Sequence, residues 1–245
     1  MPYRRLPNTD QARLRALSTA ITMGQRKAVG DLAFSANTLN RLRAFFPTFE
    51  TNIIHHKQAR QQQEKSSRGY LETVKKARLY LSHFIQILNF AIQRGDMKAD
   101  VREFYGMVGD KKSPSLNLDS EVLEWGKKII EGEHKRTLHG GNPIYNPSIA
   151  VVKVKFDQFT DAYHFQKTLQ NNTARWTGKV ASMRKEADEI ILDIWNEVEE
   201  FYASLPDDIK REKAAEYGLS YVYRPNEKVN SLYSSGKVPK NNLVF

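Results

Sequence analysis

Apolar residues recur at spacings of three and four along two long stretches of the chain. The first stretch begins with Leu39, Leu42, Phe46, Phe49 and Ile53. The spacing resumes at Leu71 and continues to Ile92, and it places apolar side chains on one face of an α-helix, as in a helical bundle. The segment between, residues 55–69, holds no large apolar residue. We therefore predict a helical hairpin over residues 35–94 that turns near residues 66–69.

The second half of the chain repeats this pattern over residues 148–205. The apolar positions lie on either side of the polar stretch Asn171-Asn172-Thr173, and they are Val152, Phe156, Phe159 and Tyr163, then Trp176, Val180, Met183, Ala187, Ile190, Ile194, Val198 and Phe201. Burying two amphipathic hairpins against each other is the simplest use of their apolar faces. The predicted fold class is mainly α: an elongated four-helix bundle from two long antiparallel helical hairpins, with short helices and a small C-terminal strand region.

The rest of the chain supplies connections and one expected strand. Residues 96–147 connect the hairpins, and the helical bundle as a whole spans residues 1–218. The sequence LSYVYRP that follows carries β-branched and aromatic residues before a proline, which is typical of a strand. A lone strand needs a partner, and residues 3–6 and 243–245 are the candidates. This strand and the polar tail after it, residues 219–245, are not an independent domain.

Caps and breakers predict several helix boundaries. Ser35 is a good cap for the first helix of the first hairpin. Pro47 lies inside the apolar pattern, and proline in a helix interior removes a hydrogen bond and clashes with the preceding turn. We therefore expect a kink or a new helix at Pro47. A later helix is expected to be capped by Asp119 or Ser120 and to end near Gly132.

The formal net charge of +10 is unevenly distributed. Residues 1–95 hold 16 Lys and Arg against five Asp and Glu, whereas residues 186–200 hold seven acidic residues. A basic excess of this kind indicates a surface for nucleic acid or another acidic partner. It is also compatible with internal pairing, in which the basic half packs beside the acidic segment.

The expected polyanion-binding surface consists of cations on the first hairpin. Phosphate binding requires such charge to be clustered on one face. The tip of the hairpin has little apolar content, so its cations are expected to be exposed. The residues assigned to this surface are Arg41, Arg43, Lys57, Arg60, Lys65, Arg68, Lys75 and Lys76.

No pattern in the sequence predicts a catalytic or metal site. The chain has no cysteine, which removes disulfides, thiolate ligands and cysteine nucleophiles. His55 and His56 point about 100° apart on a helix, with His55 expected to face solvent, so they are poorly placed to share one ion. Glu131 and His134 have Glu-x-x-His spacing, but di-iron bundles need two such motifs and further glutamates. Nucleotide-binding and hydrolase motifs are absent. We expect no catalytic residue, no metal and no cofactor.

Four segments resemble an uncharacterised family of bacterial all-helical proteins. They are PYRRLPNTDQARLRAL at 2–17, FIQILNFAIQRGD at 84–96, EWGKKIIEGEH at 124–134 and EYGLSYVYRP at 216–225. Together they are spread over nearly the whole chain. The resemblance implies an all-helical, non-secreted protein of unknown function, and it carries over no functional residue.

The sequence favours a non-enzymatic helical scaffold or protein-interaction module, whose partner is a protein or an acidic polymer. The alternative is nucleic-acid binding through the basic N-terminal half, and a second alternative is a membrane-active helical bundle. The N-terminal residues lack the apolar core of a signal peptide, and no apolar run approaches the ~20 residues that span a bilayer. A cytoplasmic location is therefore expected.

Overall fold

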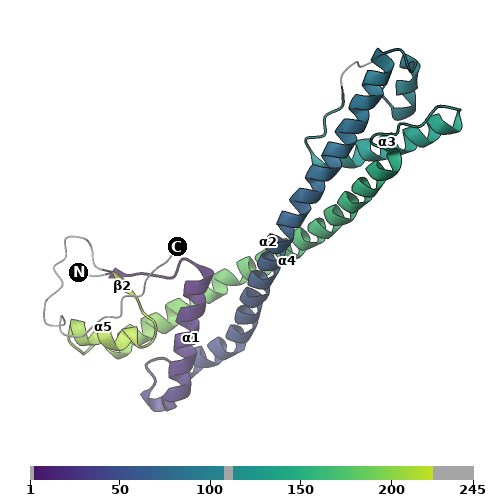
Figure 1. Cartoon of the computed structure of the whole chain (residues 1–245). Coiled ribbons are helices and arrows are strands. Elements are labelled where there is room, and N and C mark those ends of the chain that lie inside the picture. The colour runs from purple at the N-terminus through teal and green to yellow at the C-terminus, as the bar shows by residue number, and fades with distance from the viewer. Residues whose placement is uncertain (1–2, 108–112, 223–245) are drawn as a thin grey trace. The chain divides into compact units, whose positions relative to one another are not determined.

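The computed structural model of the protein describes residues 3–107 and 113–222 (Figure 1). The described chain is mainly α, which confirms that part of the predicted fold class. The elements in chain order are β1 (Tyr3–Arg4), α1 (Asp10–Arg26), the 3-10 helix η1 (Val29–Asp31), α2 (Ala36–Gln93), the 3-10 helix η2 (Ala99–Tyr105), α3 (Asp119–Leu138), α4 (Ile149–Phe201), α5 (Asp207–Ala215) and β2 (Tyr221–Val222).

The two predicted hairpins are wrong, because each is one continuous helix. α2 has 58 residues and passes without interruption through residues 66–69, where the sequence predicts a turn. α4 has 53 residues and passes through Asn171-Asn172-Thr173 in the same way. The polar residues before the expected turn in α2 are mostly Gln, Lys, Arg and Glu, which are good helix formers, and one glycine weakens a helix by only about 1 kcal/mol. Two long helices therefore take the place of the four predicted ones.

Pro47 lies inside α2 and does not start a new helix. Proline has no backbone N–H, so the helix loses the hydrogen bond that this residue would donate to the preceding turn. The side chain of Pro47 is exposed, whereas Phe46 and Phe49 beside it are buried. We infer that packing of these two phenylalanines holds the helix through the proline.

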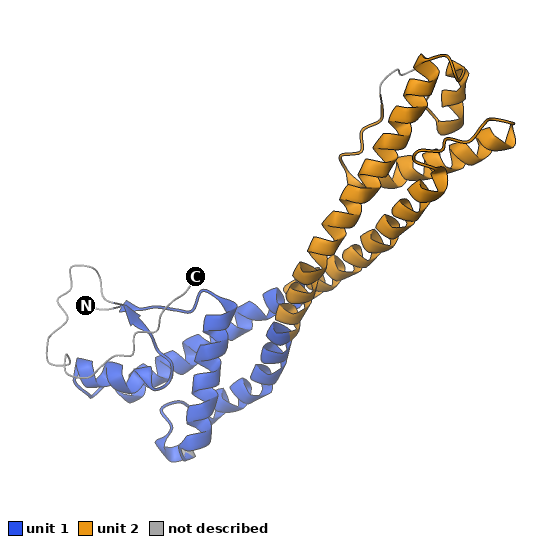
Figure 2. Cartoon of the chain, viewed as in Figure 1, with its two compact units in different colours: residues 1–54, 178–245 blue, residues 55–177 orange. Residues whose placement is uncertain are grey.

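The chain divides into two compact units (Figure 2). Unit 1 comprises residues 1–54 and 178–245, and unit 2 comprises residues 55–177. α2 and α4 contribute to both units, and each unit has its own buried apolar cluster. Each unit is therefore described by itself below.

The core of unit 1 joins α1, the first part of α2, the last part of α4 and α5. Its fully buried side chains include Leu17, Leu42, Phe49, Ile190 and Val198. The predicted cap at the start of α2 is confirmed, since the Ser35 hydroxyl accepts a hydrogen bond from the Thr38 N–H at 3.3 Å. Most of these core positions belong to the apolar pattern read from the sequence.

A small antiparallel sheet in unit 1 joins the two ends of the described chain. Tyr3 of β1 pairs with Val222 of β2, and Arg4 pairs with Tyr221. This confirms the predicted strand and its N-terminal partner. The other candidate partner, residues 243–245, and the polar tail from residue 226 onward lie outside the described residues.

The core of unit 2 joins the second part of α2, η2, α3 and the first part of α4. Leu81, Ile129 and Phe159 are among its fully buried side chains. Leu118 is the N-cap residue of α3, so the predicted cap at Asp119 or Ser120 is wrong, and the helix continues to Leu138 instead of ending near Gly132. A Cβ atom at Gly132 would lie 2.6 Å from the carbonyl oxygen of Phe104. This glycine therefore marks the close approach of η2 to α3, not the end of a helix.

Candidate interaction surface and pocket

Three of the eight predicted polyanion-binding cations have partners within the fold. In unit 1, Arg41 pairs with Glu189 of α4 at 3.1 Å and with Asp193 at 2.9 Å. The Arg43 guanidinium donates to the carbonyl oxygen of Gly24 at 3.3 Å. In unit 2, the Arg60 guanidinium pairs with Glu64 at 2.9 Å. The basic half is therefore partly neutralised inside the fold, and Arg41 pairs with the acidic segment 186–200.

The other five cations are exposed and have no ion-pair partner among the residues that the structure describes. They all belong to the unit 2 part of α2, and they are Lys57, Lys65, Arg68, Lys75 and Lys76. At about 100° per residue, Lys57, Arg68 and Lys75 lie within about 20° of one line along the helix. Lys65 and Lys76 lie to one side of that line. The structure thus brings five of the eight predicted residues onto one broad helix face.

Two leucines are exposed on the same face. Leu71 is 61% exposed and Leu79 is 62% exposed, and they flank the line of cations by about 40° on either side. The core residues Val74 and Leu81 lie about 100–120° away from that line around α2. We call these two leucines and the five unpaired cations the cationic stripe. The segment that carries the stripe, residues 57–76, is positive as a whole, because it holds six Lys and Arg against two Glu, a net charge of +4.

A buried ion pair in unit 2 links α3 to η2 and to the loop before α4. Glu133 is 0% exposed, and its carboxylate accepts from Arg136 at 2.8 and 2.9 Å and from the Ile144 N–H at 3.0 Å. The Tyr105 hydroxyl also donates to this carboxylate. Arg136 donates in addition to the carbonyl oxygen of Asn142 at 2.7 Å. Both carboxylate oxygens are therefore used within the fold, which is typical of a structural network.

The same contacts set the ionisation of this cluster. Burial opposes ionisation of Glu133, but hydrogen bonds from Arg136, Tyr105 and the Ile144 N–H outweigh it. The pKa of Glu133 therefore lies below its ordinary value of 4.5. Burial and the hydrogen bond to Glu133 raise the pKa of Tyr105, which keeps its hydroxyl protonated as a donor. The cluster is an ionised pair that a neutral phenol supports.

Sequence reasoning missed this cluster because it ended the helix too early. The buried positions of α3 include Gly132 and a series at spacings of four and three, namely Val122, Gly126, Ile129, Glu133 and Arg136. Glu133 and Arg136 thus continue the apolar face of the helix. The signal was present in the sequence, but only for a helix that runs through Gly132.

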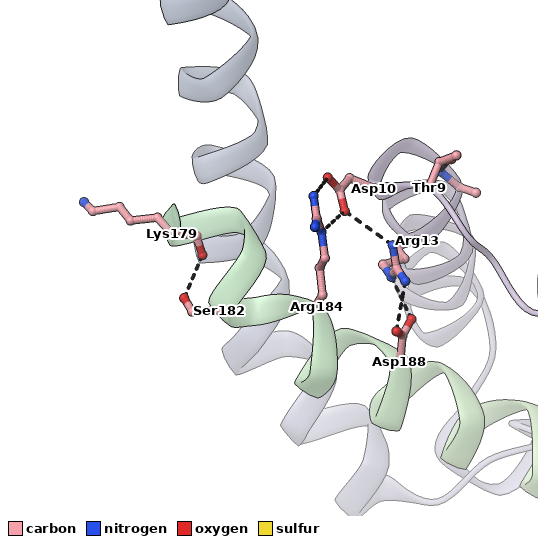
Figure 3. Close-up of polar contacts among 8 residues, drawn as sticks. Thr9, Asp10, Arg13, Lys179, Ser182, Arg184 and Asp188 are labelled. Atoms are coloured by element: carbon pink, nitrogen blue, oxygen red, sulfur yellow. Dashed lines mark hydrogen bonds and ion pairs between the residues drawn. The ribbon is translucent and has the colours of Figure 1, made fainter. Parts of the chain in front are cut away.

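A chain of charged side chains fixes the start of α1 against α4 in unit 1 (Figure 3). Arg13 donates to Asp188 at 2.7 Å and lies 3.4 Å from Asp10. Arg184 of α4 donates to Asp10 at 2.8 Å. The hydrogen bond from Arg13 to Asp188 raises the pKa of Arg13. Two cations and two anions are thus paired here, and Thr9 caps the first turn of the same helix.

Unit 1 also contains a pocket of about 590 Å³ next to the start of α1. Its wall consists of the segment between β1 and α1, the first half of α1, Trp195 of α4 and the residues before β2. The lining residues are Arg5, Leu6, Pro7, Asn8, Thr9, Ala12, Arg15, Ala16, Thr19, Trp195, Gly218 and Ser220. The side chains of Arg5, Asn8, Arg15 and Ser220 have no hydrogen-bond partner among the described residues. The sequence analysis assigned no role to these residues.

The histidine pair in α2 is not arranged as a site. His55 is half-buried and stacks on Trp176, with ring centroids 4.6 Å apart, so the expectation that it faces solvent is wrong. Within residues 3–107 and 113–222, no group of three or more His, Asp and Glu is placed to hold a metal ion. None of the helices described is both long and apolar enough to cross a membrane.

Comparisons with known proteins found no match. The chain matches no protein-family model, no curated protein and no solved structure. The resemblance to a bacterial all-helical family stays a prediction.

Proposed function

We propose that the protein is a non-enzymatic, cytoplasmic helical scaffold whose cationic stripe binds an acidic protein partner. The observation that supports this most directly is the exposed face of α2 in unit 2. On it, five exposed cations without ion-pair partners lie beside the exposed Leu71 and Leu79. Protein partners that dock on a helix use apolar anchors together with complementary charge. A partner helix with acidic residues around an apolar strip fits this face.

Nucleic acid is the second candidate for the same face. Lys57, Arg68 and Lys75 follow one line over 18 residues, which corresponds to about 27 Å of helix. Such a row is long enough to meet several phosphates. Phosphate contacts would use the cations and leave the two leucines without a role. The leucines therefore favour a protein partner and also separate the two candidates experimentally.

Neutralising the stripe is expected to weaken partner binding about tenfold or more, because charge complementarity across the interface is lost. The variant is Lys65→Gln/Arg68→Gln/Lys75→Gln/Lys76→Gln. The partner is captured from native cells on the immobilised full chain, identified by mass spectrometry, purified and titrated against each variant. A second variant, Leu71→Ser/Leu79→Ser, is also expected to bind at least about tenfold more weakly, because it loses the apolar anchors.

The matched control removes four exposed cations of unit 2 outside the stripe. It carries Lys98→Gln, Lys127→Gln, Lys135→Gln and Lys153→Gln, and it should bind the partner as the wild type does. A mobility-shift assay with a DNA duplex of about 20 base pairs runs in parallel. Salt-sensitive DNA binding that the charge variant loses and the leucine variant keeps would establish nucleic acid instead. Equal partner binding by all variants would remove the stripe as the binding site.

A further inference from the structure

The pocket of unit 1 combines unpaired cations with an apolar wall. Arg5 and Arg15 line it, and neither has an ion-pair partner among the described residues. Asn8, Thr19 and Ser220 add polar groups to the lining. Arginine presents several N–H donors in a planar fork that matches carboxylate, sulfonate and phosphate oxygens.

The acidic side chains near the pocket are already engaged. Glu199 pairs with Arg4 at 3.0 Å and accepts from the Tyr221 hydroxyl at 2.7 Å. Asp10 pairs with Arg184 at 2.8 Å. Arg5 and Arg15, both exposed, therefore have no anionic partner among the described residues, and an anion in the cavity would be attracted to both.

Trp195 and Gly218 belong to the apolar part of the pocket wall. Trp195 is 2% exposed, and the Arg4 guanidinium lies over its ring at 6.0 Å from the centroid. Gly218 has a φ of +88°, and a Cβ atom there would lie 3.4 Å from Cβ of Thr19 and 3.5 Å from Cα of Ala16. Glycine thus allows the chain before β2 to approach α1 and close this side of the cavity.

We propose that this pocket binds a small molecule with an anionic group and an aromatic or apolar body. The anionic group meets Arg5 and Arg15, and the body lies against Trp195. The volume of about 590 Å³ is within the range of sites for small ligands, about 300–1,000 Å³. The pocket lies wholly in unit 1 and the cationic stripe in unit 2, so this site is independent of the proposed scaffold function.

The test uses a pair of dyes that differ by one sulfonate group. The anionic probe is 8-anilinonaphthalene-1-sulfonate, and the uncharged probe is N-phenyl-1-naphthylamine. The protein is the full chain with Trp125→Phe and Trp176→Phe, both in unit 2, so that Trp195 is the only tryptophan. The sulfonate dye is expected to quench Trp195 fluorescence with at least about tenfold higher affinity than the uncharged dye, because of charge-assisted hydrogen bonds.

Arg5→Gln/Arg15→Gln in the same background is expected to weaken sulfonate binding at least about tenfold and to leave the uncharged dye unaffected. The control Arg26→Gln/Lys185→Gln removes two exposed cations of unit 1 outside the pocket and should bind as the parent does. Displacement of the dye by benzoate or by phenyl phosphate then identifies the head group as carboxylate or phosphate. Equal Trp195 quenching by both dyes, or equal affinity in both double variants, would overturn the proposal.

Discussion

Replacing Arg136 with methionine is expected to lower the free energy of unfolding by about 3–5 kcal/mol. Methionine keeps much of the side-chain volume but leaves the carboxylate of Glu133, which is 0% exposed, without its cation. An uncompensated buried charge is strongly destabilising because the desolvation penalty remains when the attraction is gone. Urea unfolding followed by far-UV circular dichroism measures the change.

Two further variants show whether burial is the reason for this effect. The side chains of Arg60 and Glu64 form an ion pair at 68% and 63% exposure, so Arg60→Met should change the free energy of unfolding by less than about 1 kcal/mol. Removing both charges, with Glu133→Leu/Arg136→Met, should recover much of the loss. Equal effects of Arg60→Met and Arg136→Met would contradict the structural role of the buried pair.

The same cluster makes stability fall in acid. The pKa of Glu133 lies below 4.5 in the folded chain, so its ionisation stabilises the fold above about pH 4.5. This contribution is lost as the pH falls through the folded-state pKa. The difference in unfolding free energy between the wild type and Glu133→Gln should therefore shrink as the pH falls below 4.5.

Gly132→Ala is expected to lower the free energy of unfolding by about 1–3 kcal/mol. Ordinarily this substitution in a helix interior is stabilising by about 0.5–1 kcal/mol. Here the new Cβ atom would lie 2.6 Å from the Phe104 carbonyl oxygen and 2.9 Å from Cα of Tyr105. Both are backbone atoms, so relief requires η2 to move away from α3. Urea unfolding again provides the measurement.

Gly69 and Gly178 are matched controls for this prediction. Both lie inside long helices, and a Cβ atom at either position would have no neighbour within 4 Å. Gly69→Ala and Gly178→Ala are therefore each expected to stabilise the protein by about 0.5–1 kcal/mol. Stabilisation by Gly132→Ala as well would show that η2 does not pack closely on α3.

Apolar spacing predicted which residues are buried better than it predicted where helices end. Leu42, Phe49, Leu81 and Ile190 are in the cores as expected. The spacing fails over residues 55–69 because little of that segment is buried, although its backbone stays helical. The spacing of buried residues shows which face of a helix packs against the core. It does not show where the helix ends. Glycine is an ambiguous signal of a helix end for the same reason. Gly132 lies inside α3, where it allows η2 to pack closely against the helix.

The candidate sites show where sequence reasoning lacks information. Exposure of Lys57 and Lys65 follows from the local polar pattern of residues 55–69, and the structure confirms it. Pairing of Arg41 with Glu189 depends on how α2 and α4 meet in unit 1, which no local pattern contains. The pocket brings together residues 5–19, Trp195 and residues 218–220, which only the folded chain places side by side.

The scaffold proposal depends most on α2 being one helix through residues 66–69, because only then do its cations form a stripe. The chain has no cysteine, so Lys57→Cys/Lys75→Cys accepts spin labels at those two sites alone. A continuous helix separates the two Cα atoms by about 27 Å along its axis. A turn near residue 67 would bring them to roughly 10–15 Å, the spacing of neighbouring helices plus a small offset. Pulsed electron paramagnetic resonance measures the distance between the two labels. A single distance distribution near the longer value is expected, and a peak near the shorter value would contradict a continuous α2.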